Sequence, residues 1–172
     1  MRKFRPWLIS IPGLRQGENR LKFDLDIEEL GGTSREVAEN PSFEELLGPV
    51  HVDLAIVRTG QKLLVNGRAI FEVRLSCALC GQRFQERFSE ELVTEYVNEE
   101  ETAVGERELD WEELGQEMVH GNLLNLIGVV RDAIHLAIPI APRCRPDCRG
   151  LCPVCGADLN EARCACKLLE SE

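Results

Sequence analysis

The 172-residue chain has few aromatic residues and no long apolar run. Aromatic residues make up 5% of the chain against a hydrophobic content of 44%, so the predicted core is aliphatic. No apolar run reaches about 18 residues, and no membrane-spanning helix is predicted. The basic start Met-Arg-Lys-Phe-Arg lacks a continuous apolar segment, so we interpret it as mature protein without a signal peptide and expect a cytoplasmic protein. Cysteines kept in a reducing compartment favour metal binding over disulfides.

The sequence also lacks the motifs that mark common enzyme classes. It contains no G-x-S-x-G, no Walker loop, no H-E-x-x-H and no glycine-rich dinucleotide loop. His51 and His120 are isolated, and the acidic pairs lie in runs that are typical of solvated faces. We therefore predict no catalytic residues, no enzymatic activity and no small-molecule substrate.

The net charge of −10 is unfavourable for nucleic-acid binding, because nonspecific affinity for RNA depends on neutralising phosphates. The charge is unevenly distributed, however. Twelve carboxylates and one arginine lie between Glu90 and Glu117, whereas residues 1–22 and 143–167 are mainly basic. We interpret the acidic stretch at about 98–117 as a solvated loop.

Eight cysteines are the most informative residues. Cys77 and Cys80 form one C-x-x-C-G motif, and the other six lie between positions 144 and 166. A C-x-x-C turn brings two sulfur atoms onto one ion, and structural zinc takes four such ligands at about 2.3 Å. A glycine after the second cysteine allows a tight turn that directs backbone N–H groups at the sulfurs.

Alternation of apolar and polar residues predicts an antiparallel β-sheet or a partly open barrel. Residues 21–27 and 50–56 alternate strictly, residues 4–11 are β-prone, and residues 63–65 form a short strand. The dipeptide that follows, Asn66-Gly67, is the strongest two-residue hairpin signal in the chain.

A second predicted hairpin carries the first cysteine pair. The strand at 69–77 delivers Cys77 at its end, Cys80-Gly81 makes the turn, and the chain returns through a strand at 84–97. The C-x-x-C motif at the tip of a β-hairpin is typical of a zinc knuckle.

The clearest helix covers residues 126–138, where apolar residues recur at spacings of three and four. Asn122 or Asn125 can cap it, and Pro139 ends it. We interpret His135 as a histidine at the edge of the core, with metal ligation as the alternative. One main helix in the C-terminal half and the sheet predict an α+β fold.

Loop length favours one division of the cysteines into two metal sites. Four of them are close in sequence, so closing their loop costs little entropy. The remaining four then form a second site that joins the hairpin tip to the segment after the helix. The two predicted sites are Cys152, Cys155, Cys164 and Cys166, and Cys77, Cys80, Cys144 and Cys148.

Other interpretations of the cysteines remain open at this point. One site could contain Cys144, Cys148, Cys152 and Cys155, which leaves Cys164 and Cys166 to reach the hairpin or to stay free. An iron–sulfur cluster also uses four cysteines. A thiol oxidoreductase using the C-x-x-C pair is a further alternative, although that pair lacks the helix N-terminus that lowers a thiol pKa.

Three stretches resemble the YceD family, the large ribosomal RNA subunit accumulation proteins. They are the hairpin Arg74-Leu-Ser-Cys77-Ala-Leu-Cys80-Gly-Gln-Arg-Phe84, the helix end His135-Leu-Ala-Ile-Pro139, and the tail from Cys148 through Cys155-Gly-Ala-Asp-Leu-Asn160 to Cys164-Ala-Cys166. The resemblance implies a role in 23S ribosomal RNA accumulation or processing and in assembly of the 50S subunit. It implies precursor 23S rRNA or a pre-50S particle as the partner, with no known enzymatic activity.

Charge alone marks the arginines near the zinc knuckles as candidate RNA contacts, because guanidinium groups can pair bidentately with phosphates. These residues are Arg74, Arg83, Arg143, Arg145, Arg149 and Arg163. The alternative is a protein-interaction adaptor whose acidic loop binds a basic ribosomal protein. In the predicted organisation, residues 1–143 form the core domain, and residues 144–172 form a cysteine-rich zinc-knuckle tail docked on the 77–80 hairpin.

Overall fold

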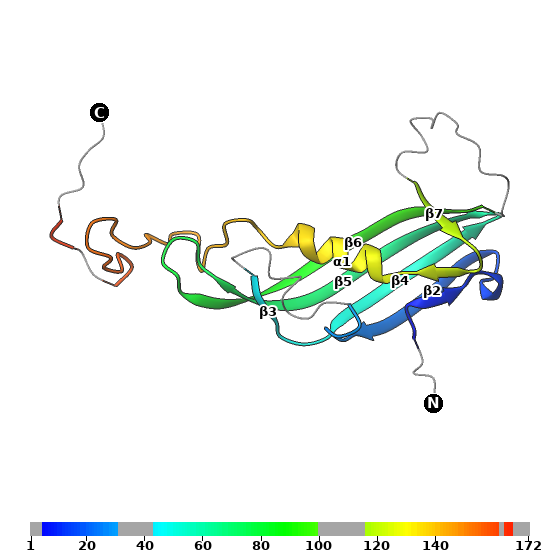
Figure 1. Cartoon of the computed structure of the whole chain (residues 1–172), viewed down its shortest axis with the longest axis horizontal. Helices are drawn as coiled ribbons and strands as arrows, with labels where there is room; N and C mark the ends of the chain where they lie inside the picture. The colour runs from blue at the N-terminus through cyan, green and yellow to red at the C-terminus, as the bar shows by residue number, and fades with distance from the viewer. Residues whose placement is uncertain (1–4, 31–42, 100–115, 162–163, 167–172) are drawn as a thin grey trace.

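The computed structural model describes residues 5–30, 43–99, 116–161 and 164–166 (Figure 1). Six strands form an open sheet: β2 (Gly17–Leu25), β3 (Phe43–Leu46), β4 (Val50–Thr59), β5 (Lys62–Ser76), β6 (Arg83–Glu99) and β7 (Gln116–His120). The strand order is β2-β4-β5-β6-β7, and β3 pairs with the C-terminal end of β5. All pairs are antiparallel except β6 with β7, which is parallel.

A smaller two-stranded ribbon and one helix complete the described fold. β1 (Leu8–Ser10) pairs with β8 (Leu123–Asn125), a short 3-10 turn covers Ile11–Gly13, and α1 covers Ile127–Ala137. The prediction of a mostly antiparallel sheet with one helix is confirmed. The sheet is open and does not close into a barrel.

The core lies between α1 and one face of the sheet. Burial alternates along β4, which shows that only one face of the sheet is covered. On β4 the buried residues are Val50, Val52, Leu54 and Ile56, and His51 and Asp53 between them are exposed. On α1 the predicted apolar face is buried at Leu126, Val130, Ile134 and Ile138. The amphipathic helix therefore covers the apolar face, and the other face is charged.

The bounds of α1 lie within one residue of the predicted helix at each end. Its N-cap residue is Leu126 and not Asn122 or Asn125, the two predicted caps, although the Asn125 side chain accepts a hydrogen bond from the Ile127 N–H at 3.1 Å. The helix ends before Ile138 and Pro139, as expected. His135 is exposed and lies outside both groups of cysteines. Within the described residues, no helix has the length and apolar character needed to cross a membrane.

The prediction of a turn at Asn66-Gly67 is wrong. β5 runs through this dipeptide without interruption from Lys62 to Ser76, and Gly67 pairs with Leu54 of β4. A Cβ atom on Gly67 would lie 2.3 Å from the carbonyl oxygen of Asp53 and 2.5 Å from the Cα of Leu54. The glycine therefore permits a close approach of two strand backbones instead of a chain reversal.

Candidate metal centres

Cys77 and Cys80 lie in the turn between β5 and β6, at one end of the long sheet (Figure 1). The Gly81 N–H donates to the carbonyl oxygen of Cys77 at 2.8 Å, and the Cys77 N–H donates to the carbonyl oxygen of Gln82 at 2.9 Å. Gly81 has a φ of 73°, which glycine adopts without a Cβ penalty. The predicted hairpin tip is confirmed.

A second turn with the same geometry begins at Cys152. The Gly156 N–H donates to the carbonyl oxygen of Cys152 at 2.8 Å, and the Cys152 N–H donates to that of Ala157 at 2.8 Å. Gly156 also has a φ of 73°. The chain thus forms the same C-x-x-C-G turn twice, once at a strand end and once in the tail.

The hairpin turn meets the segment that follows α1. We name Cys77, Cys80, Cys144 and Cys148 the hairpin cluster. The sulfur atoms of Cys77 and Cys148 lie 3.7 Å apart, as do those of Cys80 and Cys144. The Ala78 N–H donates to the carbonyl oxygen of Pro142 at 2.8 Å, which fixes the incoming segment beside the turn.

The second turn completes its set within the tail. Cys152 and Cys155 lie with Cys164 and Cys166, which we name the terminal cluster. In each cluster the four sulfur atoms lie within 4.8 Å of one another. This grouping has the same membership as the division that loop length favours, and it differs from the rival division that joins Cys144 to Cys155.

The sulfur positions fit a tetrahedral metal site. A tetrahedron with sulfur atoms about 2.3 Å from its centre has edges of about 3.8 Å, close to the 3.7 Å observed in the hairpin cluster. A disulfide requires a sulfur–sulfur distance of about 2.05 Å, and all eight cysteines are free. Each cluster can therefore hold one metal ion through four sulfur ligands.

Backbone N–H groups favour ionisation of the first cysteine in each turn. Burial raises the pKa of the Cys77 thiol, but N–H groups of Cys144, Cys80 and Leu79 outweigh burial and lower that pKa to about 6. In the second turn, the N–H groups of Cys155 and Val154 lower the pKa of Cys152 to about 6.

Other thiols of the clusters are harder to ionise. Burial, together with the neighbouring thiols, raises the pKa of Cys144 to about 12. The hydrogen bond with Cys155, followed by burial, raises the pKa of Cys166 to about 12. Closely packed thiolates repel one another, and a divalent cation offsets that repulsion when it binds.

Residues that the sequence did not single out connect the two clusters. The Leu151 N–H donates to the carbonyl oxygen of Leu79 at 3.1 Å. The Asn160 side chain, which follows the second turn, donates to the sulfur of Cys148 at 3.5 Å and accepts from the Arg149 N–H at 2.8 Å. Asn160 belongs to the quoted Cys155-Gly-Ala-Asp-Leu-Asn160 stretch, but only the fold shows that it contacts the other cluster.

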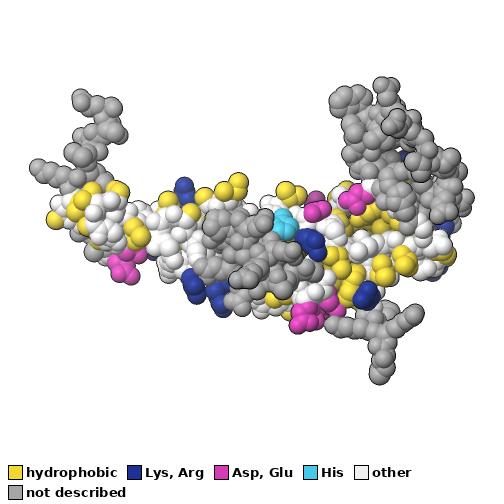
Figure 2. Space-filling view, in the orientation of Figure 1, with side chains coloured by type: hydrophobic (Ala, Val, Ile, Leu, Met, Phe, Trp, Pro, Cys, Tyr) yellow, Lys and Arg dark blue, Asp and Glu magenta, His cyan; other side chains and the backbone are white. Residues whose placement is uncertain are grey.

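Gly150 allows this close packing. It is buried, its φ is 71°, and a Cβ atom there would lie 2.9 Å from the carbonyl oxygen of Leu79. A side chain at this position would separate the tail from the hairpin turn. Figure 2 shows apolar side chains, a class that includes cysteine and proline, gathered at this end of the molecule.

The candidate RNA-contacting arginines come from two parts of the chain, the β5–β6 hairpin and the tail. Arg74 and Arg83 lie on neighbouring strands, opposite Gln85 and Ser76. Arg143 and Arg149 are exposed in the tail, and Arg145 lies 3.6 Å from a carboxylate oxygen of Asp147. Arg163 lies outside the described residues, as does most of the acidic stretch predicted at about 98–117.

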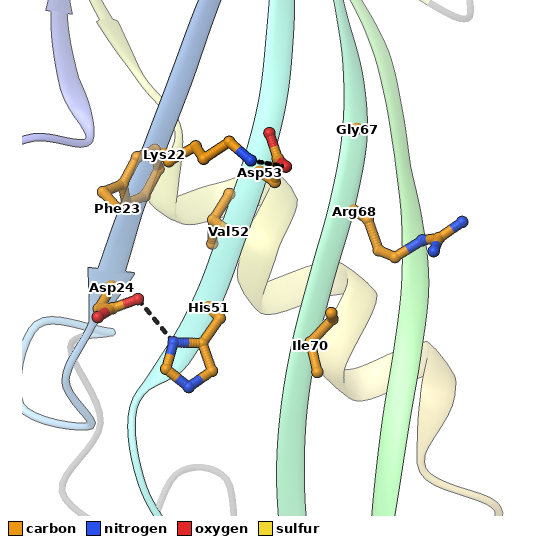
Figure 3. Close-up of a pocket in the computed structure, with 9 residues that line it drawn as sticks. All are labelled: Lys22, Phe23, Asp24, His51, Val52, Asp53, Gly67, Arg68 and Ile70. Carbon is orange, nitrogen blue, oxygen red and sulfur yellow. Dashed lines mark hydrogen bonds and ion pairs between the residues drawn. The ribbon is translucent and has the colours of Figure 1, made fainter.

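The open face of the sheet carries a shallow hollow of about 530 Å³ far from the cysteines (Figure 3). Two polar contacts cross it: a hydrogen bond of 2.7 Å between the His51 Nδ1 and a carboxylate oxygen of Asp24, and an ion pair of 2.6 Å between the Lys22 Nζ and Asp53. None of the predicted site residues lines this hollow.

A family model described as "Large ribosomal RNA subunit accumulation protein YceD" matches residues 65–171. This range contains most of β5, the following strands, α1 and both cysteine clusters. No solved structure matches the chain.

Several curated proteins are also similar. A chloroplastic protein of Arabidopsis thaliana, named large ribosomal RNA subunit accumulation protein YCED homolog 1, is 26% identical over 174 residues, covering 88% of this chain and 54% of the relative. Its Zea mays namesake is 28% identical over 144 residues, covering 69% and 49%. An uncharacterized Mycobacterium tuberculosis protein is 32% identical over 108 residues, covering 63% and 50%. The chain spans about half the length of these curated relatives.

Proposed function

Because the chain belongs to the YceD family of large ribosomal RNA subunit accumulation proteins, we propose that it is a non-enzymatic factor for 23S ribosomal RNA accumulation or processing and for 50S subunit assembly. The observation that carries the proposal is the family match over residues 65–171, which takes in the hairpin, the helix and both clusters. The family name describes an accumulation factor, which favours a role without catalysis. The plant relatives are chloroplastic, so the cytoplasmic location stays a prediction.

The proposed partner is precursor 23S rRNA or a pre-50S particle. The candidate contacts are the arginines near the two clusters, where rigid turns would hold guanidinium groups at fixed positions for phosphate oxygens. Figure 2 shows Lys and Arg side chains between the cysteine-rich end and the middle of the molecule. The protein would thus bind RNA with the end of the molecule that lies farthest from β7.

Each cluster is proposed to hold one structural zinc ion. Four thiolates leave no open coordination position for water, so the ion would stabilise the fold and supply no catalytic step. The hairpin cluster would join the β5–β6 turn to the segment after α1, and the terminal cluster would fold the end of the tail. An iron–sulfur cluster is the other group that four cysteines can hold, and metal analysis distinguishes the two.

A protein-interaction adaptor is the second candidate, and the net charge of −10 favours it. In that case the acidic stretch would bind a basic ribosomal protein, and RNA would be reached only through that protein.

Co-sedimentation with pre-50S particles tests the proposal. The protein should sediment with particles at low salt and be released at high salt, because phosphate contacts are salt-dependent. Arg83→Ala combined with Arg143→Ala and Arg149→Ala should weaken this association, and Arg20→Ala on β2 serves as the matched control. An association that survives nuclease treatment supports the adaptor, and no association at low salt rejects both candidates.

A further inference from the structure

The outer edge of β6 is long and has no partner strand among the described residues. β5 pairs with one side of β6 along residues 83–97, whereas β7 pairs with the other side only from Glu95 to Glu99. No turn or loop within the described ranges donates a backbone hydrogen bond to residues 84–94. An edge of this length can accept another strand, so its side-chain chemistry decides what pairs with it.

A row of charges on the open face ends at this edge. Lys22, Asp53, Arg68 and Glu91 are register partners across β2, β4, β5 and β6. Their signs alternate from strand to strand, and Figure 3 shows Arg68 extending from β5 over β6. The next strand in this order would place a cation opposite Glu91.

The β6 strand of a second copy of the chain, running antiparallel to the first, can supply that cation. On its open face Arg87 precedes Ser89 and Glu91 follows it, and all three side chains are exposed. When β6 is paired antiparallel with a copy of itself about Ser89, Arg87 of each copy lies opposite Glu91 of the other. This register also aligns residue 84 with residue 94, so it uses the whole unpaired edge. Registers centred on Arg87 or Glu91 place like charges opposite each other.

We propose that two copies of the chain associate through β6, antiparallel and centred on Ser89, to form one continuous sheet. The alternation would then run through Arg68 and Glu91 of one copy into Arg87 and Glu72 of the second, since Glu72 is the register partner of Arg87. Such an interface is isologous, so each ion pair occurs twice.

Exposed apolar side chains lie beside the proposed contact. Val93 on the edge is 67% exposed, Leu136 in the last turn of α1 is 86% exposed, and Ile140 in the segment after the helix is 90% exposed. In Figures 1 and 3 the end of α1 emerges beyond β6 on the buried face of the sheet. The two-fold axis is perpendicular to the joined sheet, so the helix ends of both copies lie on the same side. A second copy would therefore cover side chains that one copy leaves in water.

Sedimentation velocity on the full chain tests the proposal over a range of concentrations. The wild type should show twice the 19.4 kDa mass of one chain, with a concentration-dependent transition. Arg87→Glu or Glu91→Arg alone should raise the dissociation constant about tenfold, because each change creates two like-charge contacts. The double variant re-forms both opposite-charge contacts between the copies, so it should associate more tightly than either single variant, which a merely destabilised fold would not do.

A crosslink measures the register directly. Ser89→Cys should form a disulfide between copies under mild oxidation, because residues opposite each other in antiparallel strands are close enough for that bond. Gln85→Cys, on the same strand and face, is the matched control and should not link to itself. A monomer at every concentration overturns the proposal and indicates that the edge charges prevent pairing. A dimer without charge-reversal rescue or without the Ser89→Cys crosslink also overturns it.

Discussion

The sheet buries a continuous set of aliphatic side chains, whereas the tail between Cys144 and Cys166 buries only Cys148, Gly150 and Cys152 among its described residues. The sheet and α1 can thus be stabilised by the hydrophobic effect alone. The tail has no comparable core, and its contacts with the hairpin are backbone hydrogen bonds and clustered sulfur atoms. If metal ions occupy the clusters, one chain contains a region that needs metal to fold and a region that does not.

The largest expected effect is on the sheet. Gly67→Ala would place a Cβ against the backbone of β4 and should destabilise the protein by about 3 kcal/mol, measured by denaturant unfolding. Gly128→Ala in α1 is the control, because nothing lies within 4 Å of its Cβ position. Equal stability of the two variants would contradict the close approach at Gly67.

Metal removal should affect only the tail. Metal analysis should find two ions per chain, Cys77→Ser should lose one ion and release the tail from the hairpin, and Cys152→Ser should lose the other. Hydrogen exchange should show loss of protection at the Leu151 amide in Cys77→Ser, with the amides of β4 and β5 still protected. Loss of both ions in both variants would show that the clusters are coupled or divided differently.

Gly150 and Gly156 have nearly the same φ, but only Gly150 lies close to other atoms, so comparing alanine substitutions at the two positions separates the cost of backbone strain from the cost of steric overlap. Gly156→Ala should cost about 1–2 kcal/mol from the left-handed backbone alone. Gly150→Ala adds the overlap with the Leu79 carbonyl, so it should cost more and increase protease sensitivity of the tail. Equal sensitivity of the two variants would mean that the tail does not pack on the hairpin at this point.

The smallest effect is expected at Asn160. Asn160→Ala removes the hydrogen bond to the Cys148 sulfur and should weaken metal binding at the hairpin cluster about tenfold, measured by competition with a chelator. Glu161→Ala, which changes an exposed neighbour, should leave affinity unchanged. Weakening at the terminal cluster alone would show that Asn160 acts within its own turn.

Local patterns predicted the parts of the fold whose causes are local. The alternation on β4, the spacing on α1 and the C-x-x-C-G turns each depend on a few neighbouring residues, and all were confirmed. The grouping of the cysteines also followed from sequence, because loop-closure entropy depends on chain separation alone.

Long-range packing explains the errors. Asn66-Gly67 favours a hairpin only when its two flanks pair with each other, but residues 62–65 pair with β4 and β6 instead. Alternate residues of β5 stay on the same buried face on both sides of the dipeptide, as Leu63, Val65, Ala69 and Phe71 show. This uninterrupted alternation in the sequence was the evidence against a turn. The parallel strand β7 and the contact of Asn160 with Cys148 depend on distant partners, which no local pattern encodes.

The hairpin cluster also constrains the order of events during synthesis. Cys77 and Cys148 are 71 residues apart in the chain, and Cys80 and Cys144 are 64 residues apart. The β5–β6 turn is therefore synthesised well before Cys144 and Cys148 leave the ribosome. During this interval Cys77 and Cys80 form only half of a ligand set. The terminal cluster, in contrast, can close within a short stretch as soon as Cys166 is available. The sheet therefore has time to form before its cysteine pair meets the tail.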